Sequence, residues 1–200
     1  MRSLSSGAVL RRIDADGHVT QIVGLVGQAL FFREAFDSGA PGSVYPADAS
    51  LMLSRSDGEP PRLIDTHVSD AAMDTRTLVW SRENATDASI WMAPLDTDEP
   101  VMLQGPPVIV APGQTGPTWD LAVGSGVVGW IVWYPGADSS GTSALVVWRE
   151  GDQEGRVIAG QCQPDWLAIE DGSLLWRESL PLPGHPDTHA VPITAIPAIP

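Results

Sequence analysis

The stretch GWIVWYPGADSSGTSALVVWREGD, residues 129–152, carries the clearest fold signal in the chain. An apolar run ends near Trp133, a loop rich in Gly, Asp and Ser follows, and a second apolar run leads into an acidic turn. Runs of β-branched and aromatic residues bounded by Gly, Pro and Asp are typical of strands in an antiparallel sheet. The stretch therefore predicts two neighbouring β-strands.

Two elements of this pattern recur along the chain. The first is a hairpin, in which a strand, an acidic or glycine-containing turn and a second strand follow one another. Hairpins are expected at residues 8–24, 50–65, 89–105 and 144–160, with turns at 16–17, 57–58, 96–99 and 151–155. The second is an aromatic strand, expected at residues 29–34, 77–82, 129–134 and 173–178, with Phe32, Trp80, Trp133 and Trp176 as its anchors.

Short stretches that end in small or acidic residues precede three of the aromatic strands, at residues 67–74, 119–125 and 165–171. Only residues 25–28 precede the first aromatic strand. The repeating unit is thus an inner strand, an aromatic strand and a hairpin, which makes four strands in about 45 residues. This spacing predicts an all-β fold, namely a β-propeller of about four blades, each a four-stranded antiparallel sheet.

The two ends of the chain follow the same scheme. We expect a propeller domain over residues 1–180 and a Pro-rich edge strand or tail over residues 181–200, since proline removes a donor from a sheet ladder. The chain opens with the outer half of a blade, and its clear pattern ends with an inner half. Ring closure would then make the strands around residues 9–13 and 174–177 neighbours in one sheet; the alternative is a segment of a larger propeller.

Two stretches, TLVWSRENATDASIWMAPLD (residues 77–96) and residues 129–152, resemble the repeats of TolB-type propellers. Those repeats pair a Trp-ended strand with a polar loop and a second strand followed by Asp or Gly. These repeats usually have Ser-Pro-Asp-Gly after the Trp, and this motif is absent here: Ser81 and Arg82 follow Trp80. The resemblance implies a scaffold that binds proteins or small ligands, and it implies no catalytic residue.

Charge and composition exclude several functions. The chain has 25 acidic and 11 basic residues, for a net charge of −14, so a nucleic-acid backbone is not an expected partner. No run of apolar residues is long enough to span a membrane, and no secretory signal is recognisable. The compartment stays open to an extracytoplasmic location if the chain belongs to a longer protein. No cofactor or metal site is expected, because His185 and His189 are separated by Pro186 in an expected loop.

Three acidic residues at equivalent places near the inner strands, Asp70, Asp120 and Asp165, are the candidate ligand-binding residues. The alternative for each is a solvated loop tip. The tryptophans are expected to pack between blades, with carbohydrate stacking as the alternative for Trp91, Trp119 or Trp148.

These features favour a non-catalytic propeller scaffold that binds a protein or a small ligand. The alternative is a carbohydrate-active hydrolase or lyase that uses carboxylates facing the channel, so whether the chain is an enzyme stays open. A structural fragment without a site of its own is the third hypothesis. Carboxylates about 5–10 Å apart in one pocket would favour the enzyme.

Overall fold

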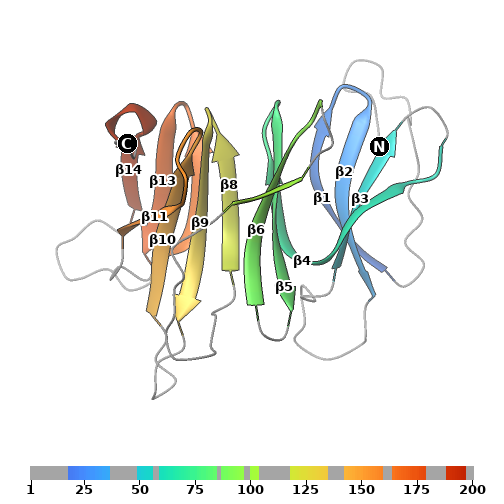
Figure 1. Ribbon diagram of the computed structural model, residues 1–200, viewed down its shortest axis with the longest axis horizontal. Coiled ribbons are helices and arrows are strands. Elements are labelled where there is room, and N and C mark those ends of the chain that lie inside the picture. Colours follow the sequence, from blue (N-terminus) through green and yellow to red (C-terminus); the bar gives the residue numbers. More distant parts are fainter. Residues whose placement is uncertain are drawn as a thin grey trace. The chain divides into compact units, whose positions relative to one another are not determined.

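The computed structural model describes residues 18–36, 49–55, 59–84, 87–96, 100–103, 118–134, 142–159, 164–178 and 188–196 (Figure 1). All but a few of these residues lie in antiparallel strands and tight turns, and one short 3₁₀ helix, Ile193–Ala195, follows the last strand. Within these ranges no helix has the length and apolar character to cross a membrane. The prediction of an all-β fold of antiparallel sheets is confirmed.

The chain divides into two compact units, residues 1–68 and residues 69–200. In the first unit, sheet 1 contains β1 (His18–Val26), β2 (Ala29–Phe36), β3 (Ala49–Arg55) and residues 62–68 of β4 (Arg62–Met73), hydrogen-bonded in that order. His67, with φ of +59°, marks the place in β4 where the first unit ends.

The hydrogen-bonded strand order runs unbroken from β1 to β7, and we call its two parts, divided within β4, sheet 1 and sheet 2; the second unit contains sheet 2 and two further sheets. Sheet 2 consists of residues 69–73 of β4, β5 (Thr77–Asn84), β6 (Asp87–Pro94) and β7 (Val101–Leu103). Sheet 3 consists of β8 (Thr118–Gly124), β9 (Val127–Tyr134), β10 (Thr142–Arg149) and β11 (Arg156–Ala159). Sheet 4 consists of β12 (Pro164–Glu170), β13 (Ser173–Glu178) and β14 (Thr188–Pro192).

The predicted order of inner strand, aromatic strand and hairpin is confirmed where the structure describes it. In sheet 3, β8 precedes the aromatic strand β9, and β10 and β11 form the hairpin. The turn between β8 and β9 needs positive φ at both central residues, and Ser125 and Gly126 have φ of +53° and +74°. Asp171 and Gly172 make the same turn between β12 and β13, with φ of +47° and +71°. This turn geometry matches the twist of paired strands.

A row of paired residues crosses each sheet at the fourth residue of its aromatic strand, and we call it the aromatic row. The rows are Ile22–Phe32–Met52–Leu63, Trp80–Trp91–Met102, Leu121–Trp130–Val146–Val157 and Leu167–Trp176–His189. The anchors Phe32, Trp80, Trp130 and Trp176 are all buried.

The predicted anchor Trp133 is therefore wrong as the equivalent of Trp80 and Trp176. Trp133 pairs with Ser143, three positions beyond the aromatic row, and its side chain lies outside the described residues. The strand carries two tryptophans, and the turn before it fixes which one is equivalent. Counted from that turn, Trp130 matches the other anchors.

The second unit has two hydrophobic clusters between its sheets. One joins sheets 2 and 3 and includes Val79, Leu121 and Trp130. The other joins sheets 3 and 4 and includes Val127, Leu167 and Trp176. Apolar side chains from neighbouring sheets thus bury each other, as expected for blades that pack face to face.

Two expectations for the chain ends are wrong. Residues 18–24 are not an arm of an outer hairpin, because they belong to β1, a complete first strand that pairs with β2. The strand at 174–177 has no free side for residues 9–13, because β13 pairs with β12 on one side and with β14 on the other. Residues 8–17 lie outside the described part of the chain.

Candidate functional site

Asp70 lies on β4 and has both its backbone and its carboxylate in hydrogen bonds. Its backbone N–H donates to Ser81 Oγ at 3.0 Å, and Ser81 is completely buried on β5. The Ser81 and Ser69 hydroxyl oxygens are 2.6 Å apart. Asp70 Oδ2 accepts a hydrogen bond of 2.9 Å from the backbone N–H of Leu121 on β8. This carboxylate therefore joins the first strand of sheet 2 to the first strand of sheet 3.

The Leu121 N–H depends on this carboxylate. Leu121 is 8% exposed, and a buried N–H without an acceptor is destabilising. The ladder between β8 and β9 is interrupted by a bulge between Trp119 and Leu121. A bulge leaves one residue out of the regular pairing, and Asp70 satisfies the backbone at that interruption.

Asp120 is the bulged residue of β8. Its φ of +48° is a conformation that Asp adopts more readily than most residues, and the residue is half-buried. Because Leu121 N belongs to the peptide that follows Asp120, the Asp70 carboxylate lies directly beside the Asp120 backbone. The structure thus brings these two candidates together.

Asp165 occupies a bulge of β12, between Pro164 and Trp166, one residue further from the aromatic row than the bulge at Asp120. Asp120 faces the step between Trp130 and Ile131 of β9, and Asp165 faces the step between Arg177 and Glu178 of β13. The Asp165 side chain lies outside the described residues. Asp70, Asp120 and Asp165 therefore lie on the first strands of successive sheets. Relative to the aromatic row, Asp120 and Asp165 differ by one residue, and the Asp70 carboxylate contacts the backbone next to Asp120.

Of the two histidines considered for a metal site, the structure describes only His189. His189 on β14 stacks on Trp176, with ring centroids 4.8 Å apart and an interplanar angle of 11°. Its Nε2 is 2.7 Å from Glu178 Oε1, and this contact is an ion pair when the imidazole is protonated. His185 lies outside the described residues. Across the described ranges no three His, Cys, Asp or Glu side chains gather closely enough to hold a metal ion.

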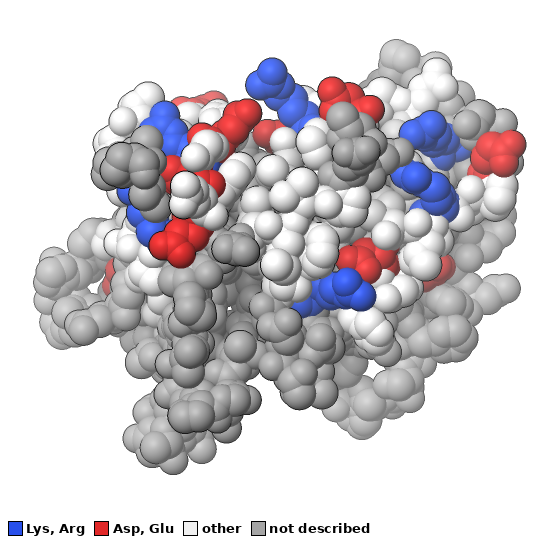
Figure 2. Space-filling view, in the orientation of Figure 1, with Lys and Arg blue, Asp and Glu red and all other residues white. Residues whose placement is uncertain are grey.

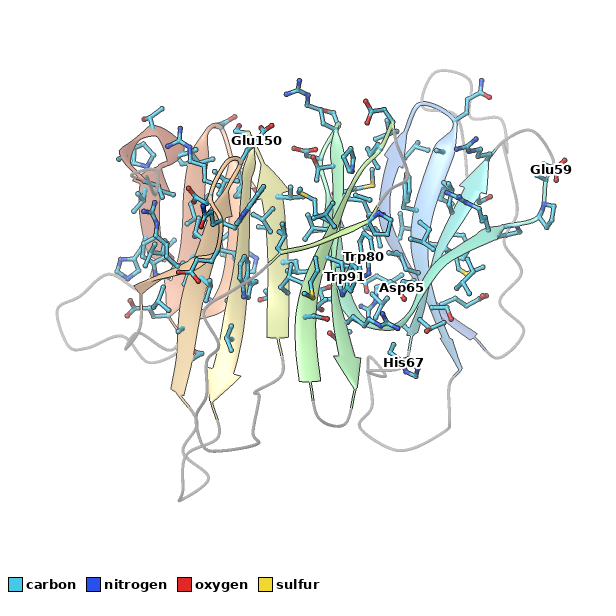
Figure 3. All side chains as sticks on the ribbon, viewed as in Figure 1. Glu59, Asp65, His67, Trp80, Trp91 and Glu150 are labelled. Carbon is cyan, nitrogen blue, oxygen red and sulfur yellow. The ribbon has the colours of Figure 1, made fainter. Side chains whose placement is uncertain are left out.

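The tryptophans proposed for carbohydrate stacking also differ from one another. Trp148 is buried, and its Nε1 donates to the Asp152 carbonyl at 2.9 Å, so it belongs to the core. Trp91 is half-buried beside Trp80, and its Nε1 donates to Ser89 Oγ (Figure 3). The Trp119 side chain lies outside the described residues. Trp91 is thus the one candidate with a described side chain that is not buried.

Sequence reasoning missed a set of exposed apolar side chains at the ends of the aromatic rows. Leu63, Met102 and Val157 end three rows on the last strands of sheets 1, 2 and 3, and all three are exposed. Ile22 begins the row of sheet 1 and is also exposed. Their equivalence could be found only from the strand register. On the described surface in view, Figure 2 shows acidic and basic groups dispersed among uncharged ones rather than gathered in one field.

The comparison with known proteins supports the fold and nothing beyond it. No protein-family model matches the chain, and no curated protein matches it significantly. Among solved structures, the β-propeller domain of the Trilobed protease from Pyrococcus furiosus aligns with 99% of the chain at 9% identity, with a TM-score of 0.60. The acylaminoacyl peptidase of Pyrococcus horikoshii aligns with 82% at 9% identity, with a TM-score of 0.53. The chain spans 60% of the first and 29% of the second. It therefore has a propeller-like fold of antiparallel sheets.

Proposed function

We propose that the chain is a non-catalytic propeller scaffold, similar to TolB-type propellers, that binds a protein or a small ligand. The observation that carries this proposal is the hydrogen bond from Leu121 N–H to Asp70 Oδ2. A carboxylate that satisfies a buried backbone group between two sheets has a structural role. The three equivalent acidic residues are then framework residues of successive first strands.

A carbohydrate-active hydrolase or lyase is the second candidate, and the proximity of Asp70 to Asp120 is the observation that favours it. Cleavage by a carboxylate pair requires one group to act as an acid and the other as a base or nucleophile. Asp70 Oδ2 already accepts a hydrogen bond from the framework, so proton transfer that keeps this bond is restricted to the other carboxylate oxygen, Oδ1. This restriction makes the scaffold the better-supported function.

The two functions are separated by following the ligand as well as the protein. The parent, Asp70→Asn and Asp120→Asn are mixed with panels of oligosaccharides and peptides, and melting temperature and ligand mass are measured. Glu154→Gln is the control, because Glu154 is exposed on the turn between β10 and β11. A scaffold is stabilised by its ligand through mass action and returns it unchanged. Ligand recovered as cleaved product with the parent, but not with Asp70→Asn that is still folded at the assay temperature, contradicts the proposal.

A further inference from the structure

We draw no further inference here: the strongest candidate, the side-chain cluster of Trp176, Glu178 and His189 between β13 and β14, joins two strands of one sheet, and nothing among the described residues points to a ligand or a partner for it.

Discussion

Removal of the Asp70 carboxylate should destabilise the second unit through a single backbone group. In Asp70→Ala the Leu121 N–H keeps its buried position but loses its acceptor, and the bulge beside it offers no ladder partner. A hydrogen bond to a charged group contributes about 1.5–3 kcal/mol, and a buried donor left without a partner costs a similar amount. Part of this loss is offset because the half-buried carboxylate no longer needs to be desolvated. We therefore expect a loss of about 1.5–2.5 kcal/mol in the free energy of unfolding.

Asp70→Asn removes the negative charge of the side chain but keeps an oxygen that can accept the Leu121 hydrogen bond. The amide oxygen can still accept the Leu121 N–H, but a neutral hydrogen bond is about half as strong. The expected order of stability is parent, Asp70→Asn, Asp70→Ala, with Asn losing about 1 kcal/mol. Glu154→Ala is the control, since it removes an exposed carboxylate from the same unit and should change stability by less than about 0.5 kcal/mol.

Tryptophan fluorescence is the assay of choice because all eight tryptophans lie between residues 80 and 176, in the second compact unit. Urea unfolding followed by this signal thus reports the unit that contains Asp70 and Leu121. The expected loss corresponds to roughly 3–10 °C in melting temperature for a chain of this size. A loss below about 0.5 kcal/mol in Asp70→Ala, or an equal loss in Glu154→Ala, refutes the reasoning.

Three further predictions concern the aromatic rows. Gly155→Ala should lower the free energy of unfolding by about 1–3 kcal/mol, because a Cβ there would overlap the buried Trp130 ring and lie 3.1 Å from a Val146 methyl group. Fluorescence quenching should then show an increased exposure of Trp130. Trp130→Ala should lower the free energy of unfolding, measured in urea, by about 3–5 kcal/mol, as other large core deletions do. A loss below about 1 kcal/mol would show that Trp130 is not the anchor of its aromatic row. His189→Ala removes the ring stacked on Trp176 and the contact with Glu178, so amide exchange in β14 should accelerate while β8 is unchanged.

The sequence was sufficient for features set by local chemistry. Alternation, turn residues and repeat spacing predicted the hairpins of β3–β4, β6–β7 and β10–β11 and all four aromatic strands. The anchor of β9 was misplaced because an aromatic strand with two tryptophans has two acceptable alignments. Only the turn at Ser125 and Gly126 fixes the register.

Features set by distant contacts were less accessible. The strand β1 was mistaken for half a hairpin because Gly24, which follows a bulge inside the strand, was interpreted as its end, whereas the strand continues to Val26 and turns at Gly27 and Gln28. Asp70, Asp120 and Asp165 were predicted to lie at equivalent places of the repeat, and the strand registers put Asp120 one residue and Asp165 two residues before the aromatic row of their sheets. That the Asp70 carboxylate reaches the backbone of Leu121 could not be predicted, because the two residues are 51 positions apart and belong to different sheets.

The most direct test of the central claim is detection of the hydrogen bond between Asp70 and Leu121 in solution. In a uniformly labelled sample, a nuclear magnetic resonance experiment that transfers magnetisation across hydrogen bonds should connect the Leu121 amide to the Asp70 carboxyl carbon. The Leu121 amide should exchange slowly with solvent in the parent and much faster in Asp70→Ala. A Leu121 amide that lacks this connection, and that exchanges in the parent as fast as the exposed amides of Ser125 and Gly126, would contradict the claim that Asp70 belongs to the framework.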